Sequence, residues 1–218
     1  MKTEKKIKRS QTSKEEFFNF LTHGTAALLS IAGLVFLVVG AAIGGDPWRI
    51  VSMSIYGASL VMLYCASTFY HFAKDSQKKS YLKIFDHTSI YFLIAGSYTP
   101  YVLVTINGTI GWVIFGIVWG ITIIGIVFKF KYVGQFKKLS LALYLGMGWV
   151  IIFAIRDIVE ALPSGGLLLL VLGGVAYSVG TIFYAKDSKP YFHAIWHLFV
   201  MAGSIFHYMS ISMYVLPK

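Results

Sequence analysis

Residues 26–44, AALLSIAGLVFLVVGAAIG, decide the fold class, because they contain no charged side chain. A helix needs about 20 mostly apolar residues to cross a bilayer, and this stretch is the centre of an apolar run over 17–44. Six further runs follow it, at 48–72, 85–105, 111–129, 138–160, 165–185 and 190–214. The runs are too long for strands and lack the alternation of a membrane β-barrel. The sequence therefore predicts an all-α membrane protein, with a seven-transmembrane helix bundle over 17–214.

The composition of the 218-residue chain agrees with this fold class. Hydrophobic residues make up 57% of the chain and charged residues 13%, and the mean hydropathy is +0.71. A soluble domain carries about 45–50% apolar and roughly 25% charged residues. Too little polar surface remains to cover a water-facing globule, which excludes an ordinary cytosolic enzyme as well as a disordered chain. Cys65 is the single cysteine, so a disulfide scaffold is also excluded.

The net charge of +10 follows the order of the loops. Most basic residues lie in the N-terminal tail and in the second, fourth and sixth loops, at one end of the predicted bundle: Lys2, Lys5, Lys6, Lys8, Arg9, Lys14, Lys74, Lys78, Lys79, Lys83, Lys129, Lys131, Lys137, Lys138, Lys186 and Lys189. The other end has only Arg49, Arg156 and Lys218. Since basic loops stay in the cytoplasm, we expect a cytoplasmic tail over 1–16 and a short external C-terminus over 215–218. Anionic membrane lipids, rather than a nucleic acid, are the partners expected for this charge.

Two local signals predict how individual helices begin and bend. The run Ser13-Lys14-Glu15-Glu16 is typical of a capping box and predicts the start of the first helix. Pro100 predicts a kink in the third helix, where Thr99 or a neighbouring group would satisfy the carbonyl that proline leaves without a donor.

Ionisable side chains inside the spans gather at one predicted depth. His71 ends the second run, Asp86 opens the third, His193 and His197 open the seventh, and His23 lies two turns into the first. Because successive runs cross in opposite directions, all five residues fall near the predicted cytoplasmic face. Such groups are costly inside a membrane and mark functional sites.

The spacing of these residues predicts a metal site. His193 and His197 stand four residues apart, which places both on one helix face and suits two nitrogen ligands of one Zn²⁺. Ser67 and His71 have the same spacing. A histidine from another helix would complete a three-histidine set that leaves the fourth position for water, as in catalytic zinc sites. Asp86 could hold that water and take its proton.

Each residue also has a structural interpretation. A histidine at a helix end can be interfacial, Asp86 can cap the third helix, and Ser67 can bond the carbonyl four residues before it. His87 is turned about 100° from its neighbour, and His207 lies about 15 Å further along the seventh helix than the pair. We therefore expect His87 to be interfacial and His207 to lie outside the site, with His23 at most supporting the ligands.

At these positions the sequence resembles the hemolysin III branch of the progestin and adipoQ receptor superfamily. The run 66–71, ASTFYH, is similar to its S-x-x-x-H motif, and 192–199, FHAIWHLF, to its H-x-x-x-H motif in the seventh span. Residues 85–91, FDHTSIY, with 95–101, AGSYTPY, resemble its third span, and 22–24, THG, its first. The motifs occur in order across nearly the whole chain.

The resemblance implies seven helices in a bacterial plasma membrane, with zinc near the cytoplasmic leaflet. It implies His71, His193 and His197 as zinc ligands, Asp86 as the residue that holds the zinc water, and Ser67 beside it. The superfamily includes enzymes that hydrolyse lipid amides and also hormone receptors, whereas the bacterial branch is named for haemolysis and linked to membrane homeostasis.

Three functions are consistent with these patterns. The first is a zinc-dependent hydrolase that acts on a lipid amide or ester inside the bilayer. The second is a membrane-lytic or pore-forming protein, which the absence of charged rings at mid-depth of the spans disfavours. The third is a sensor or receptor in which zinc only joins helices. The substrate and the oligomeric state do not follow from the sequence.

Overall fold

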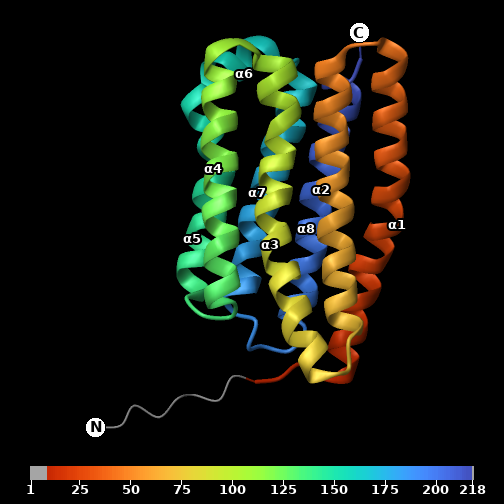
Figure 1. Ribbon diagram of the computed structural model, residues 1–218, viewed down its shortest axis with the longest axis vertical. Helices are drawn as coiled ribbons and strands as arrows, with labels where there is room; N and C mark the ends of the chain where they lie inside the picture. Colours follow the sequence, from red (N-terminus) through yellow and green to blue (C-terminus); the bar gives the residue numbers. More distant parts are fainter. Residues whose placement is uncertain (1–8, 218) are drawn as a thin grey trace.

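The computed structural model describes residues 9–217, and these fold into a bundle of long helices that contains no β-strand (Figure 1). The elements are α1 (Ser13–Gly44), α2 (Pro47–Phe72), α3 (Ser76–Pro100), η1 (Tyr101–Ile106), α4 (Gly108–Tyr132), α5 (Lys137–Gly148), η2 (Val150–Ala154), α6 (Ile155–Ala161), α7 (Ser164–Ala185), α8 (Phe192–Ser210) and η3 (Ile211–Val215). Seven continuous segments of this part are long and apolar enough to cross a membrane, which confirms the predicted fold class.

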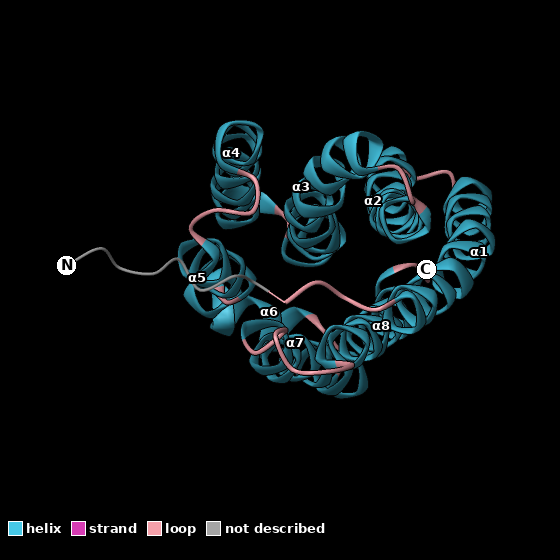
Figure 2. Ribbon diagram, turned by 90° about the horizontal axis from the view of Figure 1, so that it is seen from below, coloured by secondary structure: helices cyan, strands magenta, loops and turns pink. Residues whose placement is uncertain are grey.

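The helices follow one another around a ring that closes where α1 packs against α8 (Figure 2). Contacts are extensive between α1 and α2, α2 and α3, and α7 and α8, whereas α5 packs loosely against α3 and α7. The N-terminal side of α1 and the connections after α2, α4 and α7 share one end, which we call the basic end (Figure 1). The C-terminus of the chain lies at the opposite end of the bundle (Figure 1).

The first helix begins one residue earlier than predicted, because its cap is Thr12 rather than Ser13. The Thr12 hydroxyl accepts the Glu15 N–H at 3.3 Å, and the Glu15 carboxylate accepts the Thr12 N–H at 2.8 Å. Arg9 and the Tyr191 N–H also donate to this carboxylate. The capping box is therefore real but shifted by one position, and the Glu16 side chain is left outside it.

The third helix begins at Ser76, well before the predicted start at 85. Asp75 caps it by accepting the Lys78 N–H at 2.7 Å, so a polar first part extends the helix beyond the apolar run. Asp86 consequently lies inside α3, and its interpretation as the cap of this helix is wrong.

Three of the spans change helix type, the seventh only at its end, where α8 continues as the π-helix η3. After Pro100 the third span continues as the wider π-helix η1, while the Thr99 hydroxyl donates to the Ala95 carbonyl at 2.8 Å. The fifth span breaks at Trp149, where α5 gives way to the 3₁₀-helix η2. There the Tyr98 hydroxyl donates to the Gly148 carbonyl at 2.7 Å and accepts the Ile151 N–H at 2.9 Å. A side chain of the third span thus replaces the helical hydrogen bonds that the break removes.

Candidate metal centre

Three of the predicted histidines meet at the basic end of the bundle. His71 lies in the last turn of α2, and His193 and His197 lie in the first turns of α8. One potential ligand atom of each lies within 4.8 Å of those of the other two. His71 and His197 are buried, with exposed fractions of 5% and 2%, and His193 is half-buried. The three side chains could hold a metal ion, as the spacing predicted.

The nitrogen atoms of this group match the needs of a metal ion. His71 Nε2 and both ring nitrogens of His193 are buried without a hydrogen-bond partner. A buried polar atom without a partner is costly, and a metal ion would relieve that cost. In a tetrahedral zinc site with bonds of 2.0–2.1 Å, ligand atoms stand about 3.3 Å apart.

Glu16 supports the group from α1, and the sequence reasoning missed it. Its carboxylate oxygen Oε2 accepts a hydrogen bond from His71 Nδ1 at 2.7 Å, and Oε1 accepts one from Lys79 Nζ at 2.7 Å. A carboxylate on the far nitrogen fixes the orientation and tautomer of a ligating histidine, so Nε2 of His71 is left to face the metal. One signal was present: Glu16 and His23 are seven residues apart and share a helix face.

Thr22 orients His197 in a similar way. Its hydroxyl lies 3.3 Å from His197 Nδ1 and within 2.9 Å of the Phe18 carbonyl. This contact ties the His197 ring to α1.

His23 lies directly beside the group without belonging to it. Its ring stacks on that of His197, with the ring centroids 3.5 Å apart and the planes at 9°. The side chain is 3% exposed, and neither ring nitrogen has a hydrogen-bond partner. The supporting position expected for His23 agrees with this contact.

Ser67 and Asp86 line the same cavity as His193 and His197. Ser67 is 1% exposed, and its hydroxyl has no backbone partner, whereas the neighbouring Thr68 hydroxyl donates to the Tyr64 carbonyl at 2.6 Å. The alternative in which Ser67 bonds its own helix is therefore wrong. The structure brings Ser67 and Asp86 close to the histidines, and their catalytic roles stay predictions.

His87 and His207 lie outside the three-histidine group, as expected. The His87 ring lines the cavity, close to the basic end, rather than an open interface. His207 lies further along α8, where its Nε2 donates to the Leu170 carbonyl at 3.2 Å. Its ring packs against Gly173, where a Cβ would lie 2.1 Å from His207 Cδ2.

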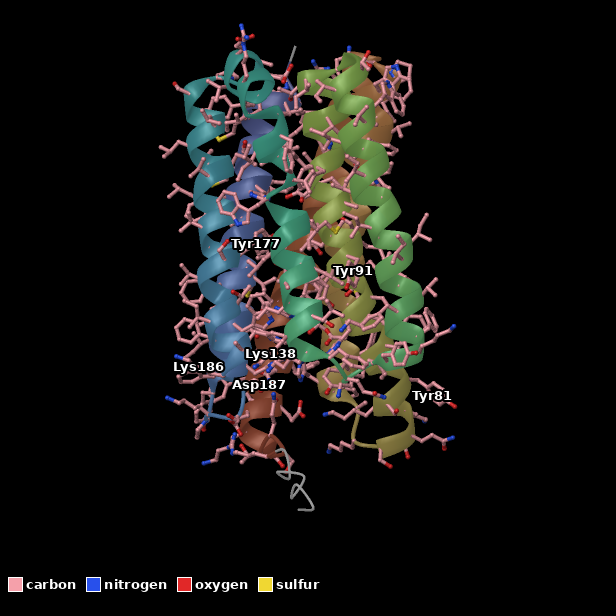
Figure 3. All side chains as sticks on the ribbon, turned by 90° about the vertical axis from the view of Figure 1, so that its left-hand side faces the viewer. Tyr81, Tyr91, Lys138, Tyr177, Lys186 and Asp187 are labelled. Carbon is pink, nitrogen blue, oxygen red and sulfur yellow. The ribbon has the colours of Figure 1, made fainter. Side chains whose placement is uncertain are left out.

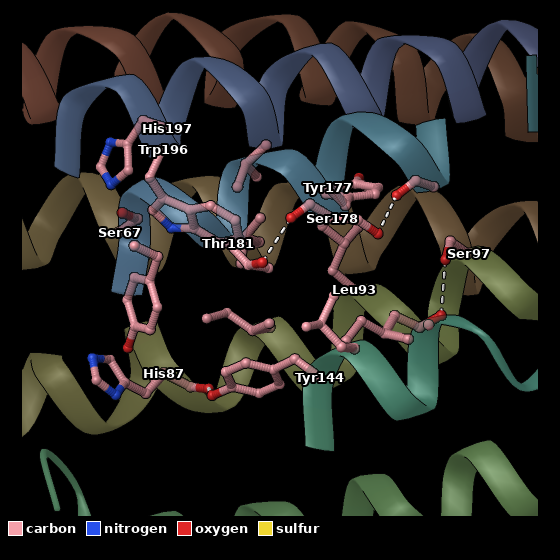
Figure 4. Close-up of a pocket in the computed structure, with 18 of the residues that line it drawn as sticks. Ser67, His87, Leu93, Ser97, Tyr144, Tyr177, Ser178, Thr181, Trp196 and His197 are labelled. Carbon is pink, nitrogen blue, oxygen red and sulfur yellow. Dashed lines mark hydrogen bonds between the residues drawn. The ribbon is translucent and has the colours of Figure 1, made fainter. Parts of the chain in front are cut away.

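The cavity has a volume of about 110 Å³ and extends from the histidines towards His207. Figure 4 shows Ser67, His87 and His197 near one end and Ser97 near the other. Its walls come from α2, α3, α5, α7 and α8 and are mostly apolar or aromatic: Leu63, Ile90, Leu93, Ile94, Tyr98, Tyr144, Leu145, Trp149, Tyr177, Tyr184, Trp196 and Val200. The metal group therefore opens onto a space that suits a hydrocarbon chain.

The sequence profile of the family described as Haemolysin-III related matches residues 11–208. The chain belongs to this haemolysin-III related family. It is 43% identical over 215 residues to Hemolysin-3 of Bacillus cereus, covering 99% of this chain and 98% of that one. It is 46% identical over 203 residues to the Hemolysin-3 homolog of Bacillus subtilis (strain 168), covering 93% and 95%.

A human protein is also similar to this haemolysin-III related chain. The monocyte to macrophage differentiation factor of Homo sapiens is 32% identical over 213 residues, covering 94% of this chain and 86% of that one. The resemblance found in the motifs is thus confirmed. Together with the seven apolar segments, the bacterial relatives indicate a multi-pass protein of the bacterial cell membrane.

Proposed function

We propose that this haemolysin-III related protein is a zinc-dependent hydrolase that cleaves an amide or ester bond of a membrane lipid. The observation that carries the proposal is the three-histidine group at the end of an apolar cavity, with Ser67 and Asp86 in the same wall. By the positive-inside rule, the site would lie near the cytoplasmic leaflet.

Zinc suits the donor set because three imidazoles form a ligand set found in catalytic zinc sites, which keep one position open. When bound, the ion supplies Lewis acidity, which polarises a carbonyl and makes water more acidic. Glu16 and Thr22 hold the rings of His71 and His197 from α1, and Nε2 of His71 is left without a hydrogen-bond partner.

The residues of the chain would complete the reaction around the carbonyl. Asp86 takes a proton from the attacking water, whose oxygen adds to the carbonyl carbon. Ser67 donates its hydroxyl hydrogen to the carbonyl oxygen as negative charge develops there. When the C–N or C–O bond breaks, Asp86 passes its proton to the leaving amine or alcohol, and a carboxylic acid remains. The apolar wall holds the acyl chain and excludes bulk water.

The test is turnover by the purified full chain on acyl-amide and acyl-ester lipids, with and without a chelator. His193→Ala is expected to lose bound zinc and turnover. Asp86→Asn is expected to keep zinc and to lower kcat by about 10²–10⁴-fold. His207→Ala, a buried histidine outside the group, serves as the control for zinc content. Turnover that survives His193→Ala would overturn the proposal.

Two alternatives remain outcomes of the same test. If zinc only joins α2 to α8, chelation lowers the thermal midpoint while no lipid is hydrolysed. If the protein lyses membranes, as the name of the Bacillus cereus relative Hemolysin-3 suggests, liposomes that contain the pure protein release an enclosed dye. Turnover without leakage supports the hydrolase.

A further inference from the structure

A second, polar pocket of about 70 Å³ lies at the basic end, next to the metal group. Its walls include Lys83 of α3, Lys129 of α4, Lys137 of α5 and Gln135 in the connection between α4 and α5. His193 lines both this pocket and the apolar cavity. The two spaces therefore adjoin at a histidine of the three-histidine group.

Lys129 is the deepest cation of this pocket. Its side chain is 1% exposed, and its Nζ donates to the Ser140 hydroxyl oxygen at 2.6 Å and lies 5.7 Å from the centre of the Tyr144 ring. The Ser140 hydroxyl hydrogen goes to the Phe136 carbonyl. An ammonium group has three donors, and among residues 9–217 no carboxylate lies within 4.0 Å of Lys129.

Lysines outnumber carboxylates among the described residues that line the pocket. Lys137 pairs with Asp187 at 2.8 Å and lies over the Tyr184 ring. Lys83 and Lys129 also line the pocket, and among the described residues Asp187 is the one carboxylate in its wall. The buried Lys129 forms no ion pair with it. Because a buried charge is costly unless it is paired, an anion in this pocket would be strongly favoured.

Further lysines surround this end of the bundle without lining the pocket. Lys138 and Lys186 lie there near Asp187 (Figure 3), and Lys131 stands two residues after Lys129 on the exposed face of α4. They add long-range attraction for an anion, whereas Lys83, Lys129 and Lys137 form the pocket itself.

We propose that this lysine pocket binds a phosphate group, and that the phosphate belongs to the headgroup of an anionic lipid. Lysine binds phosphate as a compact point charge. In phosphoglycerides the phosphate and the acyl carbonyl are separated by only a few bonds, so one molecule can reach both the pocket and the metal group. The acyl chain then occupies the apolar cavity. The inference rests on the proposed function only in naming its substrate class, since binding requires no turnover.

The test measures the thermal midpoint of the purified full chain in a neutral detergent during titration with dioctanoyl phosphatidic acid. Dioctanoylglycerol, which has the same chains without phosphate, and inorganic phosphate form the two parallel arms. We expect a saturable rise with phosphatidic acid and a smaller rise with dioctanoylglycerol, whose chains can enter the apolar cavity. Lys129→Met should weaken the apparent affinity at least about tenfold, because it removes a charged donor. Lys131→Met, on the same helix but exposed, should leave it unchanged.

Different results would overturn the phosphate pocket and the lipid as the source of the phosphate. A rise of equal size with dioctanoylglycerol, or an unchanged affinity in Lys129→Met, would overturn the phosphate pocket. Inorganic phosphate that binds as tightly as phosphatidic acid would overturn the lipid as its source. If Lys129→Met does not fold, the half-buried Lys83→Met must show the loss instead. Zinc content is measured on the same samples, so failure of the metal centre and failure of the phosphate pocket are distinguished.

Discussion

Glu15 and Glu16 are neighbours in the sequence, but their side chains have different partners and different roles. Its neighbour Glu15 is committed to the helix cap and to Arg9, while Glu16 reaches across to His71 and Lys79. A carboxylate that holds the far nitrogen of a ligand raises the basicity of that ligand. Glu16 therefore supports the candidate metal centre through His71 Nδ1, on the side of the ring away from the other histidines.

We predict that Glu16→Gln weakens zinc binding by about 10–100-fold, because the amide cannot hold the His71 N–H as strongly as a carboxylate. Zinc affinity is measured by competition with a chromogenic chelator. Glu160→Gln is the matched control, since Glu160 pairs with the exposed Arg156 in α6. Equal affinities in wild type and Glu16→Gln would contradict the role assigned to this residue.

The candidate site could be predicted where its residues share a helix. His193 and His197 were found by their spacing, and His71 and Asp86 by the depth that the loop charges assign to helix ends. Glu16 and Thr22 were missed because their partners lie on other helices, and spacing within one helix says nothing about neighbours across the bundle. The lysine pocket was missed for the same reason: Lys83, Lys129 and Lys137 come from three helices.

At the scale of the helices, close packing depends on glycine at particular turns. Gly125 of α4 faces the buried Tyr91 of α3, where a Cβ would lie 2.5 Å from the ring. Gly120 lies on the same helix with nothing within 4 Å of a Cβ. The two positions therefore separate the packing role of glycine from its effect on helix formation.

We predict that Gly125→Ala destabilises the bundle by about 1–3 kcal/mol, because the methyl group forces Tyr91 or α4 to move. Gly120→Ala should be neutral or slightly stabilising, since alanine is the better helix former. Thermal midpoints of both variants in the same detergent provide the comparison. A Gly125→Ala midpoint equal to that of Gly120→Ala would show that α4 does not pack on Tyr91.

The helices were largely predictable and their interruptions only partly so. Apolar runs identify seven spans because a helix needs about 20 apolar residues to cross a bilayer. Pro100 indicates the irregularity of the third span, because proline interrupts helical hydrogen bonding. The start of α3 was missed because its first turns are polar and project beyond the apolar run. The break at Trp149 has no proline, and the hydroxyl that stabilises it belongs to Tyr98 of another span. A sequence signal confined to the fifth span could not indicate it.

For the whole molecule, the two ends of the bundle differ in charge, and the positive-inside rule predicts an orientation in the membrane from that difference. We predict that the connection after α2 faces the cytoplasm and the connection before α7 faces outward. Lys78→Cys and Ser164→Cys place exposed cysteines in the first turns of α3 and α7, next to these connections, in a background in which Cys65 is replaced by serine. A membrane-impermeant maleimide applied to whole cells should label only Ser164→Cys. Labelling of Lys78→Cys in intact cells would reverse the orientation.

Because α1 packs against α8, the metal centre unites side chains from opposite ends of the chain: Thr22 and His197 are separated by 175 positions. Chains fold from the N-terminus onward during synthesis. Glu16 and His71 are therefore already in the bilayer long before the ribosome reaches His193. A nascent chain that stops short of α8 contains only one of the three histidines, so the candidate metal centre is complete only in a polypeptide that has been translated and inserted to its last helix.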